Sequence, residues 1–121
     1  MTNMLKKTST YQENKRKLSD SCSVNDTLSF IGKRWLMTAL YEISLGCDQF
    51  STLKNKIPGI SEQMLASRIE DLVKKGLIVK EQIRSTTPVQ IAYSITNKGS
   101  DLLKVLNTLD EWTNIWEYPQ Q

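Results

Sequence analysis

Residues 50 to 95 read FSTLKNKIPGISEQMLASRIEDLVKKGLIVKEQIRSTTPVQIAYSI, and this stretch decides the fold. Its apolar residues first recur at steps of three and four, which indicates helix, and Pro58-Gly59 breaks that pattern in two. After Gly76 the pattern changes to β-branched runs with alternation, which indicates strands. The expected elements, in order, are helices over 50 to 57 and 61 to 76 and strands over 77 to 84 and 89 to 95.

The helix that starts at Ser61 is amphipathic. Ser61 is the expected N-cap, because its hydroxyl can accept a backbone hydrogen bond that the first turn cannot satisfy internally. Lys74-Lys75-Gly76 supplies a basic last turn and a glycine stop. The apolar face holds Leu65, Ile69 and Leu72, and the outward face holds Gln63, Ala66, Ser67 and Glu70. A helix of this kind can rest on a partner helix and present its outward face to a ligand.

Helical patterns also flank the central stretch. They are expected around Val24, Leu28 and Ile31, around Trp35, Leu36, Ala39, Leu40 and Ile43, and, after the N-cap Thr96, around Leu102, Val105, Leu106, Leu109, Trp112 and Trp116. Residues 1 to 20 are polar and are expected to form a flexible basic arm, and residues 21 to 118 one domain. The expected fold class is α+β, mainly α: a winged helix-turn-helix with additional N- and C-terminal helices that form a dimer interface.

Several ordered motifs resemble the HxlR (DUF24) family of bacterial transcriptional regulators. They are Cys22-Ser-Val-Asn-Asp-Thr-Leu28, Ile31-Gly-Lys-Arg-Trp35, Phe50-Ser-Thr-Leu53, Ile57-Pro-Gly-Ile-Ser61, Met64-Leu65, Leu72-Val-Lys-Lys-Gly-Leu-Ile78, and Tyr93-Ser-Ile-Thr96 with Gly99. The resemblance covers roughly residues 22 to 116. It implies a homodimeric winged-helix regulator, usually a repressor, with some members sensing oxidants or electrophiles through a cysteine at the position of Cys22. The first ten residues lack the continuous apolar core of a secretory signal, so a cytoplasmic protein is expected.

The expected DNA contacts fall on the second helix of the helix-turn-helix. Gln63 and Ser67 are the predicted base-edge contacts, because glutamine can bond adenine with both its donor and its acceptor. Ser61 and Arg68 are the predicted flanking contacts to phosphate or base, since arginine pairs with guanine or phosphate. The alternative is that these residues form only the solvated face of an amphipathic helix.

Further contacts are predicted on the neighbouring elements. Lys54 and Lys56 are expected to meet phosphates, with the solvated face again the alternative. Arg84, Thr86 and Gln90 are the candidates on the hairpin. The net charge of +3 comes from residues 1 to 20, and residues 48 to 98 hold eight basic against five acidic groups. This distribution suits a polyanionic partner such as a double-stranded operator, although chance can also produce it.

The final helix predicts a homodimer. Trp112 and Trp116 continue the leucine stripe past the length that one domain core needs, which favours a partner helix over an intramolecular lid. The predicted interface consists of Val24, Leu28 and Ile31 on the first helix and Leu109, Trp112 and Trp116 on the last.

The two cysteines are the candidate sensors. Cys22 lies just before an expected helix start, where the positive end of the helix dipole favours the reactive thiolate. Cys47 follows Gly46 in a turn and is a candidate resolving thiol. The alternative for a free cysteine is a small buried hydrophobe. The candidate inducer is an oxidant, a quinone or another electrophile.

Composition argues against several other classes of protein. The 121 residues include no histidine, the commonest general base and zinc ligand, and no phosphate-binding glycine loop. We therefore expect no catalytic residues, no metal, no cofactor and no enzyme activity. No apolar stretch approaches the roughly 20 residues of a membrane span, so no membrane partner is expected. The alternative function is a winged-helix protein-interaction module that lacks specific DNA binding.

Overall fold

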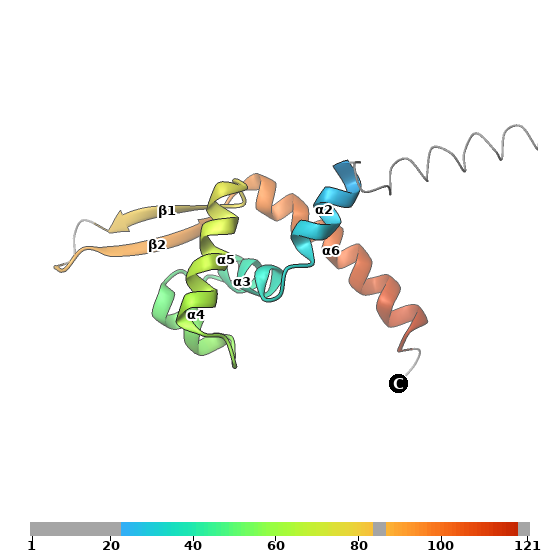
Figure 1. Ribbon diagram of the computed structural model, residues 1–121, viewed down its shortest axis with the longest axis horizontal. Coiled ribbons are helices and arrows are strands. Elements are labelled where there is room, and N and C mark those ends of the chain that lie inside the picture. The colour runs from blue at the N-terminus through green and yellow to red at the C-terminus, as the bar shows by residue number, and fades with distance from the viewer. Residues whose placement is uncertain (1–22, 84–86, 119–121) are drawn as a thin grey trace, which may run out of the picture. The chain divides into compact units, whose positions relative to one another are not determined.

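The computed structural model describes residues 23 to 83 and 87 to 118. The helices are α2 (Ser23–Ile31), α3 (Leu36–Ser44), α4 (Phe50–Lys56), α5 (Glu62–Lys74) and α6 (Asn97–Trp116), and the strands are β1 (Ile78–Ile83) and β2 (Gln90–Ile95) (Figure 1). The chain divides into two compact units, Met1–Arg34 and Trp35–Gln121. In the first unit the described residues are 23 to 34, and they contain one helix, α2. The second contains the helix-turn-helix, the hairpin and α6, which confirms the predicted winged-helix class.

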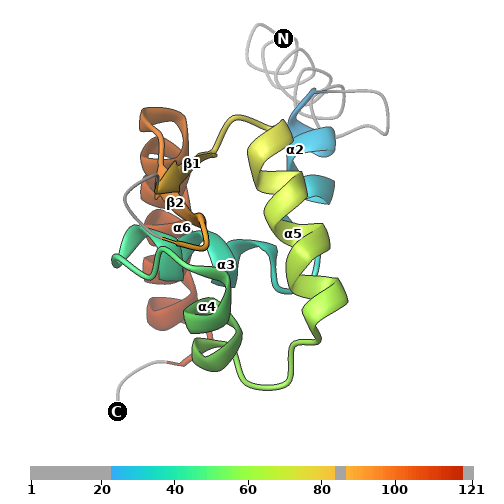
Figure 2. The ribbon, with the colours of Figure 1, turned by 90° about the vertical axis from the view of Figure 1, so that its left-hand side faces the viewer.

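α3 lies at the centre of the second unit. It contacts α4, α5, α6 and β2, and Figure 2 shows it between the flanking helices. Its buried residues are Leu36, Ala39, Leu40 and Ile43, all at helical spacing. The sequence predicts helix from Trp35, but Trp35 has a left-handed backbone with φ of 74° and caps the helix instead. The rest of the buried core comprises Leu53, Ile57, Ile60, Leu65, Ile69, Leu72, Leu77 and Ile78.

The turn after α5 is closed by glycine, as the sequence predicts. Gly76 has a φ of 77°, its N–H bonds the carbonyl of Val73 at 3.0 Å, and the N–H of Leu77 bonds the carbonyl of Leu72 at 3.0 Å. These two bonds form a Schellman motif, which satisfies carbonyls that the helix end leaves free. The chain therefore leaves α5 in a fixed direction and enters β1.

The hairpin is an antiparallel pair in which Ile78 lies opposite Ile95 and Ile83 opposite Gln90. Because side chains alternate along a strand, Ile78 and Lys80 share one face with their partners Ile95 and Tyr93. The buried Ile78 directs this face toward the core. The hairpin is also tied to the loop before α4, because the Tyr93 N–H donates to the Asp48 carbonyl at 2.8 Å.

Candidate nucleic-acid interface

The outward face of α5 is open to solvent. Ser61 caps the helix as predicted, with its Oγ accepting from the N–H of Met64 at 3.0 Å. The apolar face of α5 is buried, so the helix is held against the core through one side only. Gln63 and Ser67 lie on the opposite side and are exposed. Two polar side chains one helical turn apart are thus available to meet base edges, as major-groove recognition requires.

Arg68 has a different environment from Gln63 and Ser67. Its Nη1 lies 2.9 Å from Oδ2 of Asp71, and the two side chains are only 16% and 23% exposed. A contact between this guanidinium and DNA therefore requires the ion pair to open or to share its remaining donors. The DNA contact at Arg68 stays a prediction, and the printed ion pair lies within α5 itself.

The basic residues beside α5 are distributed over two helices. Lys54 and Lys56 form the last turn of α4, where Lys54 is half-buried and Lys56 exposed. Lys74 in the last turn of α5 lies 3.0 Å from Glu70, with both side chains largely exposed. Such an exposed pair is weak, so the Lys74 ammonium remains available to a phosphate.

Only part of the predicted wing lies within the described residues. Arg84 and Thr86 fall outside them. Gln90 begins β2, and its Oε1 accepts from Nε2 of Gln49 at 3.0 Å. Together with the bond from Tyr93 to Asp48, this contact fixes the hairpin relative to the loop before α4. The position of the wing beside α5 is therefore set by side-chain and backbone bonds in addition to the core.

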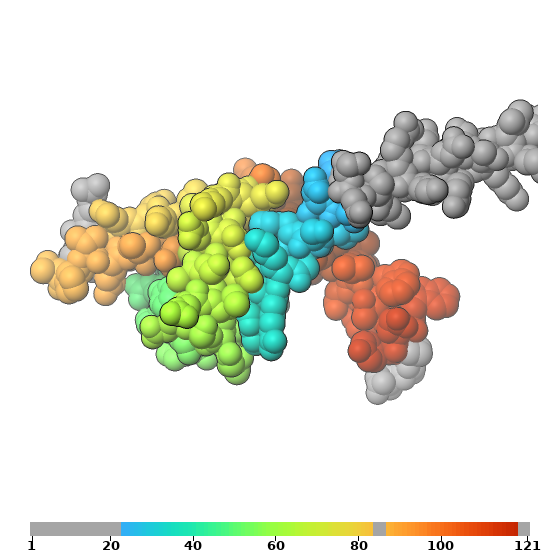
Figure 3. Space-filling view, viewed as in Figure 1, coloured from blue at the N-terminus to red at the C-terminus, as the bar shows by residue number. Residues whose placement is uncertain are grey.

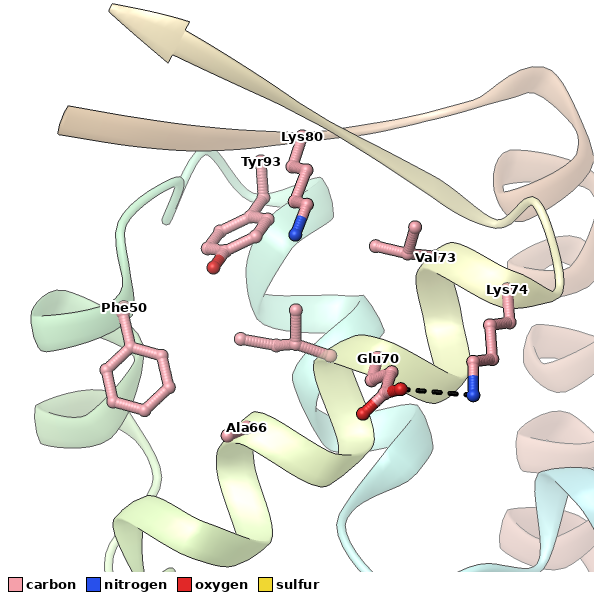
Figure 4. A pocket seen from close by; sticks show the side chains of 8 residues that line it. Phe50, Ala66, Glu70, Val73, Lys74, Lys80 and Tyr93 are labelled. Carbon is pink, nitrogen blue, oxygen red and sulfur yellow. Dashed lines mark ion pairs between the residues drawn. The ribbon is translucent and has the colours of Figure 1, made fainter. Parts of the chain in front are cut away.

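A cleft of about 420 Å³ lies where α4, α5 and the hairpin meet (Figure 4). Figure 4 shows Lys80 and Tyr93 pointing from the hairpin toward α5, with Phe50 on the α4 side. Burial raises the pKa of Tyr93, so its phenol stays a neutral donor. The lining residues are Phe50, Ala66, Ile69, Glu70, Val73, Lys74, Lys80 and Tyr93.

Neither Lys80 nor Tyr93 is among the site residues predicted from the sequence. The signal that would have found them is the strand register: both share the inward face with Ile78, yet they lie far enough along the hairpin to be out of the core. A lysine at such a position points its ammonium between α5 and the hairpin. This is where a DNA backbone runs when a helix and an adjacent hairpin contact neighbouring grooves.

The predicted dimer residues on α6 are exposed. Leu109 and Trp112 are each 53% exposed and Trp116 is 68% exposed. The C-terminal half of α6 extends away from the helix-turn-helix (Figure 1 and Figure 3). On α2, which belongs to the other unit, Val24 and Leu28 are exposed and Ile31 is half-buried. None of the predicted interface residues on α6 is buried in the core of its own unit.

Only one of the two cysteines, Cys47, lies within the described residues. Cys22 lies outside the described residues. Cys47 is a half-buried free thiol in the loop before α4. Burial and then the Glu42 carboxylate raise the pKa of Cys47, against a smaller lowering by Lys56. At neutral pH this group is therefore the protonated thiol, which is the less nucleophilic form. The resolving role of Cys47 stays a prediction.

Within 23 to 83 and 87 to 118, no three His, Cys, Asp or Glu side chains come together as a metal site. Over the same residues, no helix is both long enough and apolar enough to cross a bilayer.

The chain is similar to known helix-turn-helix regulators. Residues 30–121 match the family described as HxlR-like helix-turn-helix. A putative regulatory protein MalR of Fusobacterium mortiferum is 35% identical over 98 residues, which cover 80% of this chain and 92% of that protein. The reduced form of the transcriptional regulator YodB from B. subtilis superposes with a TM-score of 0.72 at 26% identity, covering 81% of this chain and 95% of that one. The redox regulator HypR in its oxidized form superposes with a TM-score of 0.68 at 27% identity, covering 77% of this chain and 95% of that one.

Proposed function

Because the chain belongs to the HxlR-like helix-turn-helix family and is a DNA-binding transcriptional regulator, we propose that it binds a double-stranded operator as a homodimer and represses transcription in the cytoplasm. The N-terminal part of α5 enters the major groove and the hairpin lies beside it. The observation that carries this proposal is the uncovered polar face of α5, with Gln63 and Ser67 exposed directly after the Ser61 cap.

The contacts divide into two classes. Gln63 and Ser67 read base edges, because an amide and a hydroxyl can match the donors and acceptors of a base pair. Lys54, Lys56 and Lys80 neutralise phosphates, which adds affinity without sequence information. In this proposal the cleft between α5 and the hairpin accepts the backbone that separates the two contacted grooves. Arg68 is paired with Asp71 in the same helix and is expected to reach DNA only if this ion pair opens or is shared with the DNA.

Replacing Gln63 by alanine is expected to weaken binding to the preferred operator by about 1–3 kcal/mol and to relax preference at one base pair. The Gln63 side chain is exposed and is not part of the core, so the fold stays intact. The measurement is fluorescence anisotropy at fixed salt with an operator obtained by selecting bound duplexes from a random pool. Repeating the selection with Gln63→Ala reveals which base pair loses its preference.

Lys80→Ala is the matched control for this experiment. It removes a charge from the cleft, so affinity should fall by a similar factor for all sequences and the dependence of log affinity on log salt should become shallower by about one unit. An unchanged base preference in Gln63→Ala would argue against major-groove reading by α5. Binding that is independent of sequence and lost at moderate salt would favour the protein-interaction module instead.

Cys22 is the thiol through which this regulator would respond to redox conditions. HypR, which is similar to this chain, is described as a redox regulator. Oxidation or alkylation of the Cys22 thiol would shift the dimer between arrangements that can and cannot bind DNA. The regulated genes are then released from repression when an oxidant, a quinone or another electrophile modifies the thiol.

Treatment with the thiol oxidant diamide is expected to lower the operator affinity of the wild-type protein at least tenfold and to leave Cys22→Ser unaffected. Operator anisotropy before and after treatment, and again after reduction with dithiothreitol, gives the comparison. Cys47→Ser, treated in parallel, reports whether the second thiol takes part. Equal responses from the wild type and Cys22→Ser would remove Cys22 from the sensing mechanism.

A further inference from the structure

The C-terminus of α5 and the N-terminus of α6 meet in a compact joint, which we define as Lys75–Leu77 together with Thr96–Gly99. The Schellman turn at Gly76 satisfies the carbonyls of Leu72 and Val73, and the carbonyls of Lys75 and Gly76 are further acceptors along the chain. Both are taken by side chains of the α6 N-terminus. The joint therefore connects the proposed recognition helix directly to the helix that carries the proposed dimer face.

Thr96 holds both sides of this joint. Its Oγ1 donates to the carbonyl of Gly76 at 2.7 Å and accepts from the N–H of Gly99 at 3.1 Å. Its own N–H donates to the carbonyl of Leu77 at 3.0 Å, which extends the strand ladder by one rung. One hydroxyl thus caps α6 and bonds the turn that ends α5. A threonine that served only as an N-cap would need the acceptor function alone.

Lys98 adds a second connection. Its Nζ donates to the carbonyl of Lys75 at 2.7 Å, so a cation lies at the negative end of the α5 dipole. The stem of the same side chain lies 3.9 Å from the position of a Cβ on Gly76. Thr96 and Lys98 therefore bond adjacent carbonyls, and two bonds at two points resist rotation of α6 about the end of α5.

The length of α6 makes this resistance consequential. A helix of 20 residues is about 30 Å long, so a rotation of about 10° at one end displaces the other end by about 5 Å. The exposed tryptophans lie at that far end. Adjacent base pairs are about 3.4 Å apart. An uncertainty of 10° at the joint would therefore move one recognition helix by more than a base pair relative to its partner.

We propose that the hydrogen bonds from Thr96 and Lys98 to the end of α5 set the spacing between the two recognition helices of the dimer, and so determine which half-site spacing the regulator selects. This inference rests on the proposed function, because it needs a dimer built through α6. It makes Thr96 and Lys98 positioning residues, since neither reaches DNA in this arrangement.

The test uses the double variant Thr96→Val/Lys98→Met, which keeps the size of both side chains and removes both donors, together with the Thr96 acceptor that caps α6. Two copies of the selected half-site are placed in a series of duplexes that differ by one base pair in separation. We expect the wild type to prefer one separation at least tenfold over its neighbours and the double variant to distinguish them less than threefold. Affinity for a duplex with one half-site should stay within twofold. Thr96→Ser/Lys98→Met, which retains the hydroxyl, should recover part of the preference.

A second readout needs no DNA. Spin labels on Ser67→Cys, in a background with Cys22→Ser and Cys47→Ser, report the distance between the two α5 helices of the dimer. We expect a narrow distribution for the wild-type joint and a broad one for the double variant. Equal widths and an unchanged preference for spacing would overturn the inference while leaving specific DNA binding in place. Loss of half-site binding by the wild type itself would overturn the proposed function and this inference with it.

Discussion

Trp112→Ala/Trp116→Ala is expected to turn the dimer into a monomer at micromolar concentration and to abolish specific operator binding. The two indoles are 53% and 68% exposed in a helix whose far half extends from its own unit. Their removal therefore leaves the core of the monomer intact. In a dimer the same indoles would be buried, and buried tryptophans are the residues that most often dominate an interface.

The size of this effect follows from interface energetics. A central tryptophan costs about 2 kcal/mol or more on truncation, and each 1.4 kcal/mol is tenfold. Loss of two tryptophans, about 4 kcal/mol, should therefore weaken association about 700-fold or more. A monomer engages only one half-site and loses the gain in effective concentration that linkage provides. Sedimentation velocity gives the oligomeric state, and thermal unfolding checks that each subunit still folds.

Lys104→Ala is the control on the same helix. Its ammonium lies 3.5 Å from Asp101 with both side chains more than three-quarters exposed, and a surface pair of this kind contributes little. This variant should dimerise and bind the operator as the wild type does. If the double tryptophan variant still sediments as a dimer, the interface lies on another surface.

Local chemistry is what made the fold predictable. Ser61 and Thr96 were identified as caps because each precedes an apolar helical pattern, and both accept the expected backbone bonds. Gly76 is the predicted stop of α5, and its φ of 77° is positive. The helices start after the capping residue, which is why α5 and α6 begin at Glu62 and Asn97. These signals act within four residues along the chain, so a single sequence contains them.

The candidate site was less predictable because its geometry depends on contacts across elements. The burial of Arg68 against Asp71 has a local signal in the spacing of three residues, but its low exposure comes from the packing of α5. Lys80 enters the cleft only through the register of β1 with β2. Lys98 bonds the carbonyl of Lys75 across 23 positions of sequence. The residue types were visible in the sequence, whereas the distances that give them roles arise from tertiary packing.

Gly99→Ala is expected to destabilise the protein substantially, although alanine normally favours a helix. Gly99 is buried in the first turn of α6, and a Cβ there would overlap the backbone carbonyl oxygen of Leu77 and approach Cγ1 of Ile95 to 2.7 Å. The carbonyl of Leu77 also accepts from the N–H of Thr96, so the backbone cannot withdraw without losing a bond of the ladder. Overpacking of this kind costs about 1–3 kcal/mol and here outweighs the roughly 1 kcal/mol of helix propensity that alanine gains.

Because the rigid backbone leaves little room for relaxation, the overpacking cost should lie near the upper end of this range. Subtracting the gain in helix propensity leaves a net loss of about 2 kcal/mol, which should lower the melting temperature by about 8 °C or more. Differential scanning calorimetry of the purified chain provides the measurement. Ser100→Ala is the matched control one position along, since it gains helix propensity in the same turn and adds no atom. Its melting temperature should equal or exceed that of the wild type. If Gly99→Ala has the same melting temperature as Ser100→Ala, α6 can shift away from Leu77. The joint would then be too loose to hold the spacing of two recognition helices.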